Sequence, residues 1–336
     1  MLTGGGVTIK PRTRLIILVF LLLLLTLLAL CLGRYPKAGF NNPLRLLQDE
    51  LLAQVVWNVR LPRILLAITG GATLAMAGFV FQMLFNNPLV EPGFLGVSQG
   101  AAFGAAMAIT IVGSSFLLVQ LSATFFGLLA LIASYYLARK FSYGGWVLRL
   151  VLSGIAVGAF FSAALSVVKL VAAPTTSLQD ITFWMMGGLW NTTWSRAWSV
   201  MPTMWIILLG LLAIRWRINL LSLDERSAHS IGIAINREKA LVLLFATIAT
   251  TAIISVSGLI GWVGLIIPHV ARRLFGANAR YSLPGSMVLG ALFLLASDTI
   301  GRSLLSSEIP LGVLTSLVGA LLFIIIFARK KSEVGL

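Results

Sequence analysis

Charged residues are scarce in this chain: Asp, Glu, Lys and Arg together make up 10% of its 336 residues. A soluble globular domain has about 25%, so the scarcity excludes a protein whose surface mostly faces water. Charge is missing altogether from residues 15–33, 64–90, 92–138, 240–268 and 309–328. A helix that crosses a bilayer needs about 20 apolar residues. The sequence therefore predicts an all-α integral membrane protein that crosses the bilayer several times.

Acidic residues are the rarer of the two charged kinds. Ten Asp and Glu stand against 25 Lys and Arg, which gives a formal net charge of +15. A strong basic excess can indicate nucleic-acid binding, but here the basic residues form small clusters between apolar stretches. That arrangement is typical of the inner loops of membrane proteins. We therefore expect the lipid bilayer as a partner, and no nucleic acid.

The side chains that most often carry chemistry are also rare. A single cysteine, Cys31, excludes an intrachain disulfide framework. The two histidines, His229 and His269, are far apart and lack partners at the spacing of a metal site. The stretch "TGGGV" at 3–7 lacks the lysine of a phosphate-binding loop. We expect no catalytic site, no metal site and no cofactor in this chain, and we predict that it is not an enzyme.

Lys169 and Asp298 are the candidates for functional ionisable residues inside the predicted spans. Such residues mark ion pathways in secondary transporters. Lys169 is near the end of its predicted helix, where a lysine can extend to water. Asp298 precedes Arg302 by four residues, a spacing that permits a local ion pair. A structural role is favoured for both, and an ion-coupled secondary transporter remains the alternative function.

Hydropathy predicts about ten transmembrane helices and places both termini on the same side. With that side taken as the cytoplasm, 17 of the 25 Lys and Arg lie inside and 8 outside, as the positive-inside rule requires. Turns are expected at "VGSSF" (112–116) and at the glycine-rich "SGLIGWVG" (257–264). The predicted helices are 15–33, 62–83, 93–112, 116–138, 148–171, 197–215, 239–257, 260–275, 283–302 and 310–328.

Four stretches carry a resemblance to a known family. They are "VRLPRILLAITGGATLAMAGFVFQMLFNNPLVEPGFLGVSQGA" (59–101), "SLDERSAHSIGI" (222–233), "SGLIGWVGLIIPHVARRLFG" (257–276) and "EIPLGVLTSLVGALLF" (308–323). Over residues 15–330 the chain resembles the permease subunits of ABC importers for metal chelates, namely cobalamin, ferric siderophores and haem. Some members of that family move molybdate or tungstate.

The resemblance implies the type II importer permease fold, with residues 1–336 forming one transmembrane domain. It also implies a homodimer in the bacterial inner (cytoplasmic) membrane. Two ATPase subunits would bind ATP and Mg on the cytoplasmic face, and a periplasmic or lipoprotein binding protein would deliver substrate on the other. Whether that substrate is a metal chelate or molybdate/tungstate stays open, because no residue of the chain decides it.

The resemblance also assigns roles to particular residues. Arg60, Arg63 and Arg302 match arginines that pair with glutamates of the binding protein, a contact suited to guanidinium groups. Residues 222–233 match the cytoplasmic coupling helices that sit in a cleft of the ATPase. The predicted coupling residues are Ser227, Ala228, His229, Ser230, Ile231, Gly232 and Ile233.

A cytoplasmic gate is implied in two loops. Asn87 and Leu89, in "FNNPLVEPG", match its first element. The second element departs from the family, because related permeases have a short hydroxyl-rich turn where this chain has the longer "KFSYGGWVLR" (140–149). The predicted gate residues of that loop are Ser142, Gly144, Gly145 and Trp146.

Overall fold

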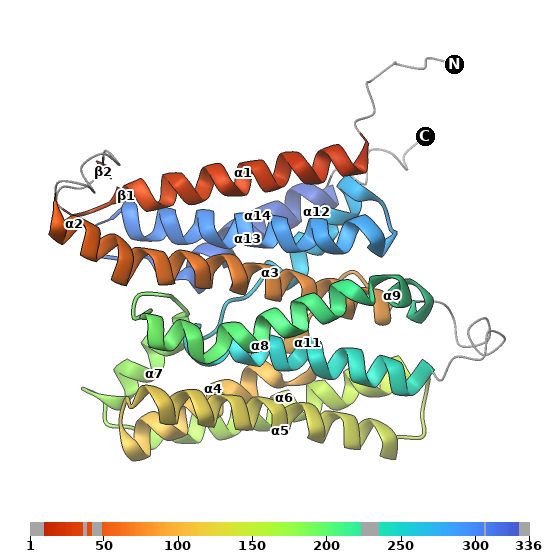
Figure 1. Ribbon diagram of the computed structural model, residues 1–336. Coiled ribbons are helices and arrows are strands. Elements are labelled where there is room, and N and C mark those ends of the chain that lie inside the picture. Colours follow the sequence, from red (N-terminus) through yellow and green to blue (C-terminus); the bar gives the residue numbers. More distant parts are fainter. Residues whose placement is uncertain (1–9, 36–38, 42–48, 223–234, 306, 329–336) are drawn as a thin grey trace.

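The computed structural model describes residues 10–35, 39–41, 49–222, 235–305 and 307–328. Within them the chain is a bundle of roughly antiparallel helices (Figure 1). One end of the bundle, called the α9 end, carries the start of α1, the end of α14 and the helix α9; the opposite end, called the α2 end, carries α2 and α7. These two names are kept below.

The long helices follow the predicted ones closely. They are α1 (Pro11–Cys31), α3 (Leu61–Leu84), α4 (Val97–Val112), α5 (Phe116–Lys140), α6 (Trp146–Val171), α8 (Trp194–Ala213), α11 (Ile235–Ser257), α12 (Val263–Phe275), α13 (Ala279–Ser303) and α14 (Leu311–Ala328).

Shorter elements join them. These are α2 (Glu50–Val55), the π-helix η2 (Val56–Arg60), the 3₁₀-helix η3 (Pro92–Leu95), α7 (Ser177–Met186), α9 (Arg215–Leu221) and the two-residue antiparallel strands β1 (Leu32–Gly33) and β2 (Gly39–Phe40).

The count of about ten spans is not confirmed. Seven helices of the described chain are long and apolar enough to cross a membrane, with α2, η2 and α3 running together as Glu50–Leu84. The apolar helices Val97–Val112 and Leu311–Ile326 are shorter, and α12 has 13 residues. Part of the difference arises because hydropathy does not show where a helix begins: the predicted stretch 93–112 includes residues of the separate 3₁₀-helix η3, and 260–275 includes the break before α12.

Both predicted turns are confirmed. Helix α4 ends at Val112, and Gly113 adopts a left-handed φ of 86° before α5 begins at Phe116. The break between α11 and α12 begins at Gly258, with φ 68°, and ends at Trp262, with φ 70°. Positive φ is a conformation that glycine adopts without steric cost. The glycines therefore set where these two helices stop.

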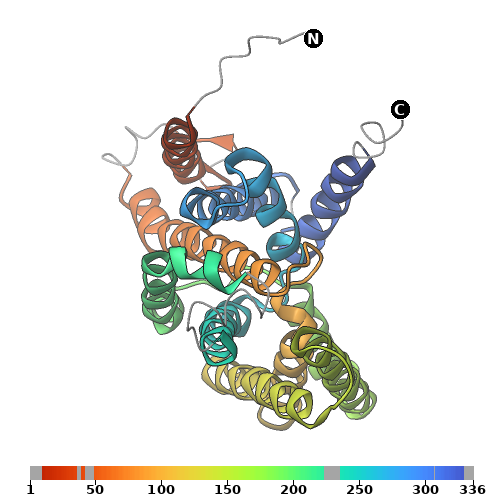
Figure 2. The ribbon, with the colours of Figure 1, turned by 90° about the vertical axis from the view of Figure 1, so that its right-hand side faces the viewer.

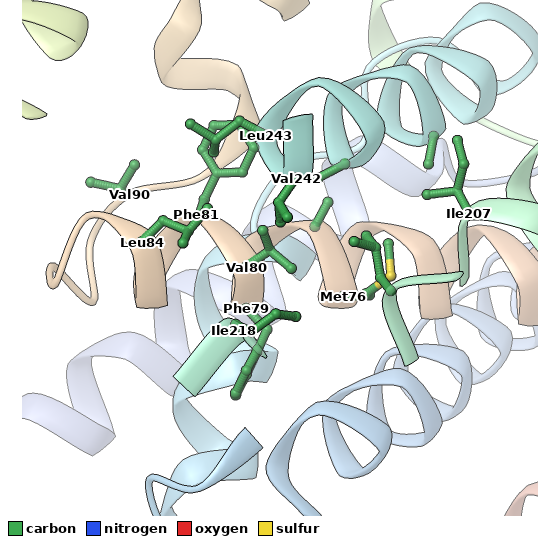
Figure 3. Packing of buried hydrophobic residues seen from close by; sticks show 14 of the residues in the cluster. Met76, Phe79, Val80, Phe81, Leu84, Val90, Ile207, Ile218, Val242 and Leu243 are labelled. Atoms are coloured by element: carbon green, nitrogen blue, oxygen red, sulfur yellow. The ribbon is translucent and has the colours of Figure 1, made fainter. Parts of the chain in front are cut away.

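Helix α3 is the centre of the bundle. In its apolar stretch, 89% of the residues are buried, and Met76, Phe79 and Phe81 expose nothing. They pack with side chains of α8, α9 and α11, as Figure 3 shows around Val242, Leu243 and Ile218. In Figure 2, α1, α12, α13 and α14 lie on one side of α3, and α4, α5, α6, α8 and α11 lie on the other. A helix in this position holds the two halves of the molecule together.

Candidate functional site

Three buried arginines lie at the α2 end. Arg60 ends η2, Arg63 is in the first turn of α3, and Arg302 is in the last turn of α13. They are only 5%, 8% and 8% exposed. These are the residues predicted to dock a binding protein. Docking stays a prediction, and each guanidinium group already has partners inside the protein.

Arg63 binds two carboxylates. Its Nε lies 2.9 Å from Oδ1 and 3.1 Å from Oδ2 of Asp298, and its Nη1 lies 2.9 Å from Oε2 of Glu308. Asp298 is completely buried, whereas the Glu308 side chain is 39% exposed. Burying a carboxylate is costly unless it is paired and hydrogen-bonded. Asp298 therefore depends on Arg63, which reaches it from a helix far away in the sequence.

The predicted local pair on α13 is confirmed. Arg302 Nε lies 3.8 Å from Asp298 Oδ2, four residues earlier on the same helix. The pairing of Asp298 with Arg63 was not predicted. Sequence spacing shows pairs within one helix, but residues that meet across two helices leave no such signal.

Arg60 and Arg302 also bind the end of α1. Arg60 donates to the carbonyls of Leu30 at 2.8 Å and Tyr35 at 3.0 Å. Arg302 donates to Leu32 O at 2.8 Å and to Ala29 O. The last carbonyls of a helix have no partner within it, and a cation there also interacts favourably with the helix dipole. These two arginines therefore fasten α1 to the rest of the bundle.

The first predicted gate loop follows α3 at the α9 end. Asn87 Oδ1 accepts a hydrogen bond from Leu89 N at 2.9 Å, which forms a side-chain turn, and Leu89 is 44% exposed. Asn86, with φ 47°, donates from Nδ2 to Ser222 O at 3.0 Å. The loop thus touches Ser222, the first residue of the predicted coupling segment.

The second predicted gate loop joins α5 to α6 at the same end. Ser142, Gly144 and Gly145 are exposed, and Gly144 has a φ of 79°. Trp146, the first residue of α6, packs against the buried cluster that includes Leu84, Val90 and Leu150. The structure therefore brings Trp146 of the second loop close to the first.

The predicted coupling residues Ser227 to Ile233 lie outside the described residues. The flanks of that segment are fixed. Asn219 of α9 donates to Asn278 Oδ1 at 3.0 Å and accepts from Ala279 N at 2.9 Å, which attaches α9 to the start of α13. Arg217 of α9 lies 3.6 Å from Glu238 of α11. The two flanking helices, α9 and α11, are thus attached to the bundle and to each other.

A cavity of about 390 Å³ lies between α3, η3, α4, α11 and the break before α12. Glu91, Ser98, Gln99 and Thr250 line it together with apolar side chains and glycines. No hydrogen bond or ion pair joins the Glu91 carboxylate to another of the described residues. Glu91 was not predicted as a site residue. Its position as the single charge between residues 64 and 138 is a sequence feature that could have identified it.

Lys169 occupies the place expected for it. It is in the last turn of α6 and partly buried. Among the described residues, none of His, Cys, Asp or Glu forms a group of three that could hold a metal ion.

Sequence comparison finds that the chain is similar to transport permeases. The model of the FecCD transport family matches residues 21–329. The molybdate import system permease protein MolB of Haemophilus influenzae is 37% identical, over 94% of this chain and 95% of that protein. The hemin transport system permease protein HmuU of Yersinia pestis is 36% identical, over 97% of this chain and 98% of that protein.

A solved structure shares the fold over nearly the whole chain. It is described as an inward-facing conformation of a metal-chelate type ABC transporter, and it is 36% identical in sequence. The TM-score is 0.88, with 95% of this chain and 99% of that chain covered. The similarity therefore extends through every region discussed above.

Proposed function

This chain belongs to the FecCD transport family of metal-chelate type ABC importer permeases, and from that premise we propose its part in one importer. It is the membrane-spanning subunit through which a metal-containing substrate moves inward by alternating access. The observation that carries the proposal is the similarity to importer permeases over the whole length of the chain. Transport, and not catalysis, is the activity of such a subunit.

The energy for transport would come from partner subunits. The sequence contains no phosphate-binding loop of the kind that holds ATP, so a separate ATPase must hydrolyse it. Two copies of the permease would form the pathway between them, with one ATPase subunit for each copy. A binding protein would bring substrate to the opposite face of the membrane.

The α9 end is proposed to face the cytoplasm and the α2 end the outside. Basic residues cluster at the α9 end, at the start of α1, where α5 ends and α6 begins, in α9 and at the end of α12, as expected for the inner face. Both termini would then be cytoplasmic. The segment 222–233 would meet the ATPase at the α9 end, between α9 and α11.

Ser222 connects the proposed ATPase-binding segment to the proposed gate. The Asn86 side chain binds Ser222 O at 3.0 Å, one residue away from the proposed gate residue Asn87. A movement of the coupling segment would therefore pull on the loop that carries Asn87 and Leu89. Trp146, with Ser142, Gly144 and Gly145 before it, would complete the gate from the start of α6.

The binding protein is proposed to dock at the α2 end. Arg60, Arg63 and Arg302 remain its proposed contacts, but they bind Asp298, Glu308 and the end of α1 in the free chain. Glu308 is the exposed member of the network. A carboxylate of the binding protein would reach Arg63 by replacing Glu308, which exchanges one ion pair for another.

The substrate is proposed to be a metal chelate or an oxyanion such as molybdate. Relatives of nearly equal identity are named for molybdate and for hemin, so identity does not separate the two classes. The alternative, an ion-coupled carrier, required Asp298 or Lys169 to bind an ion. Asp298 is instead enclosed by two arginines, and this occupied position disfavours that mechanism.

Uptake into proteoliposomes tests the proposal. The chain is reconstituted with its ATPase, with ATP inside and binding protein outside, and labelled molybdate, a ferric siderophore and cobalamin are offered separately. We expect uptake of one class that stops when an ATPase variant unable to hydrolyse ATP is used. Uptake that continues with the inactive ATPase and follows an ion gradient would contradict the proposal.

A further inference from the structure

Two adjoining cavities lie at the α9 end, where α5 ends and α6 and α11 begin. The outer one has a volume of about 490 Å³ and is lined by Tyr135, Ala138, Arg139, Trp146, Arg149 and Arg237. The other, called the apolar cavity, has a volume of about 220 Å³. Tyr135 lines both cavities, so they are neighbours that share this residue.

The outer cavity holds positive charge without a matching negative charge. Three of its lining residues are arginines and none is acidic. No ion pair joins Arg139 or Arg237 to another described residue. Glu238, next to Arg237 in sequence, pairs with Arg217 instead. Guanidinium groups gathered in this way are suited to bind a phosphate group, which they grip with two parallel hydrogen bonds.

Arg149 strengthens this interpretation. Its Nη1 donates to Phe141 O at 3.0 Å, which fixes the side chain across the end of α5. Its Nε is buried and has no hydrogen-bond partner among the described residues. A buried donor left unpaired is costly. An anion in the cavity would relieve that cost.

The apolar cavity is suited to hold a hydrocarbon chain. Its walls are formed by Leu131, Ile132, Leu150, Leu241 and Leu244, among others. Ile132 and Leu241 remain exposed at its rim, so the groove opens on the side of the bundle. At the junction, Tyr135 and Trp146 meet edge to face with ring centroids 5.8 Å apart. Such aromatic residues are typical of the level at which lipid headgroups meet hydrocarbon.

We propose that these cavities form one binding site for an anionic phospholipid. The phosphate of its headgroup binds Arg139, Arg149 and Arg237, and an acyl chain lies along Leu131, Leu150 and Leu244. Basic pockets between helices at a membrane face bind anionic lipid headgroups in this way. The charge selects the headgroup, and the joined apolar groove selects a lipid over a soluble anion.

Native mass spectrometry of the purified, delipidated full chain tests the proposal. Phosphatidylglycerol, phosphatidylcholine and inorganic phosphate are offered separately to the wild type and to R139Q/R237Q. Arg149 is left unchanged because it also binds the end of α5. The matched control is R12Q/R273Q, which removes two exposed charges from the same end of the bundle. A third variant, Ala240→Trp, fills the apolar cavity without changing the charge.

We expect the wild type and R12Q/R273Q to retain phosphatidylglycerol in preference to phosphatidylcholine. R139Q/R237Q should lose that retention by about thirtyfold, and A240W should also lose it. Equal retention by R139Q/R237Q and its control would overturn the proposal. Inorganic phosphate that binds as well as the lipid, with A240W unaffected, would show an anion site without an acyl groove and would also overturn it. Each variant is compared at matched elution volume and melting temperature, so that loss of fold is not read as loss of lipid.

Discussion

Asp298 shows how one buried residue organises its surroundings. It receives Arg63 from α3 and Arg302 from its own helix, and it exposes none of its surface. Removing one partner of a buried ion pair costs about 3–5 kcal/mol, because the remaining charge is left without compensation. The stability of the α2 end should therefore depend on Asp298 much more than on the neighbouring exposed carboxylate.

The change Asp298→Asn tests this dependence. We expect it to reduce the free energy of unfolding by about 3–5 kcal/mol, measured by thermal unfolding of the purified chain in detergent. The matched control is Glu308→Gln, which removes a partly exposed partner of the same arginine and should cost about 1 kcal/mol or less. Equal losses in the two variants would show that burial does not determine the strength of the network.

At the scale of the helix, close contact depends on glycine. Gly78 of α3 lies against Gly264 of α12, so near that an added Cβ would be 1.9 Å from Gly264 O. Gly71 of α3 meets Gly290 of α13 with a corresponding distance of 2.2 Å. Small residues allow helix backbones to approach in a membrane, where apolar surface alone gives no preference for other helices over lipid. These contacts hold α12 and α13 against α3.

Gly78→Ala should separate α3 from α12. The contacting atom is the backbone oxygen of Gly264, which cannot move without moving α12. We expect little monodisperse protein in size-exclusion chromatography. Gly210→Ala in α8 is the matched control, since nothing lies within 4 Å of its added Cβ, and alanine is favoured over glycine in a helix by about 1 kcal/mol. Equal yields of the two variants would mean that α12 can move away from α3 at little cost.

At the scale of the whole molecule, the two ends differ in chemistry. At the α2 end, the three buried arginines form a network closed by carboxylates and carbonyls. At the α9 end, Arg139 and Arg237 have no ion-pair partner among the described residues. A count of charges shows how many basic residues each end has, but not which of them are paired. Positive charge at the α9 end, carried by these two arginines, can interact with lipid or a partner subunit, which agrees with its proposed cytoplasmic position.

Cysteine labelling tests the proposed orientation. After Cys31→Ser, single cysteines are introduced by Phe40→Cys at the α2 end and by Tyr143→Cys at the α9 end. Both positions are well exposed, at 63% and 79%. A membrane-impermeant maleimide should label F40C in intact cells and Y143C only after permeabilisation. The reverse pattern would place the termini outside the cell.

The sequence by itself determined the class of protein, the positions of the long helices and the family. Apolar runs and their breaks are local properties, so "VGSSF" and "SGLIGWVG" marked real helix ends. The motifs "RLPR" and "NNPLVEPGFLG" are also local. The number of spans was not determined, since an apolar run does not show where a helix breaks, as happens before α4 and before α12.

Only the tertiary structure decided what individual charges contact. Arg63 meets Asp298 across 235 positions of sequence, and Arg60 and Arg302 bind backbone carbonyls, which no residue pattern identifies. The same holds for Arg139, Arg149 and Arg237, which come from three helices and share one cavity. Electrostatic and hydrogen-bonding interactions depend on distance in space. Their partners are therefore fixed by how the helices pack, and not by the order of residues in the chain.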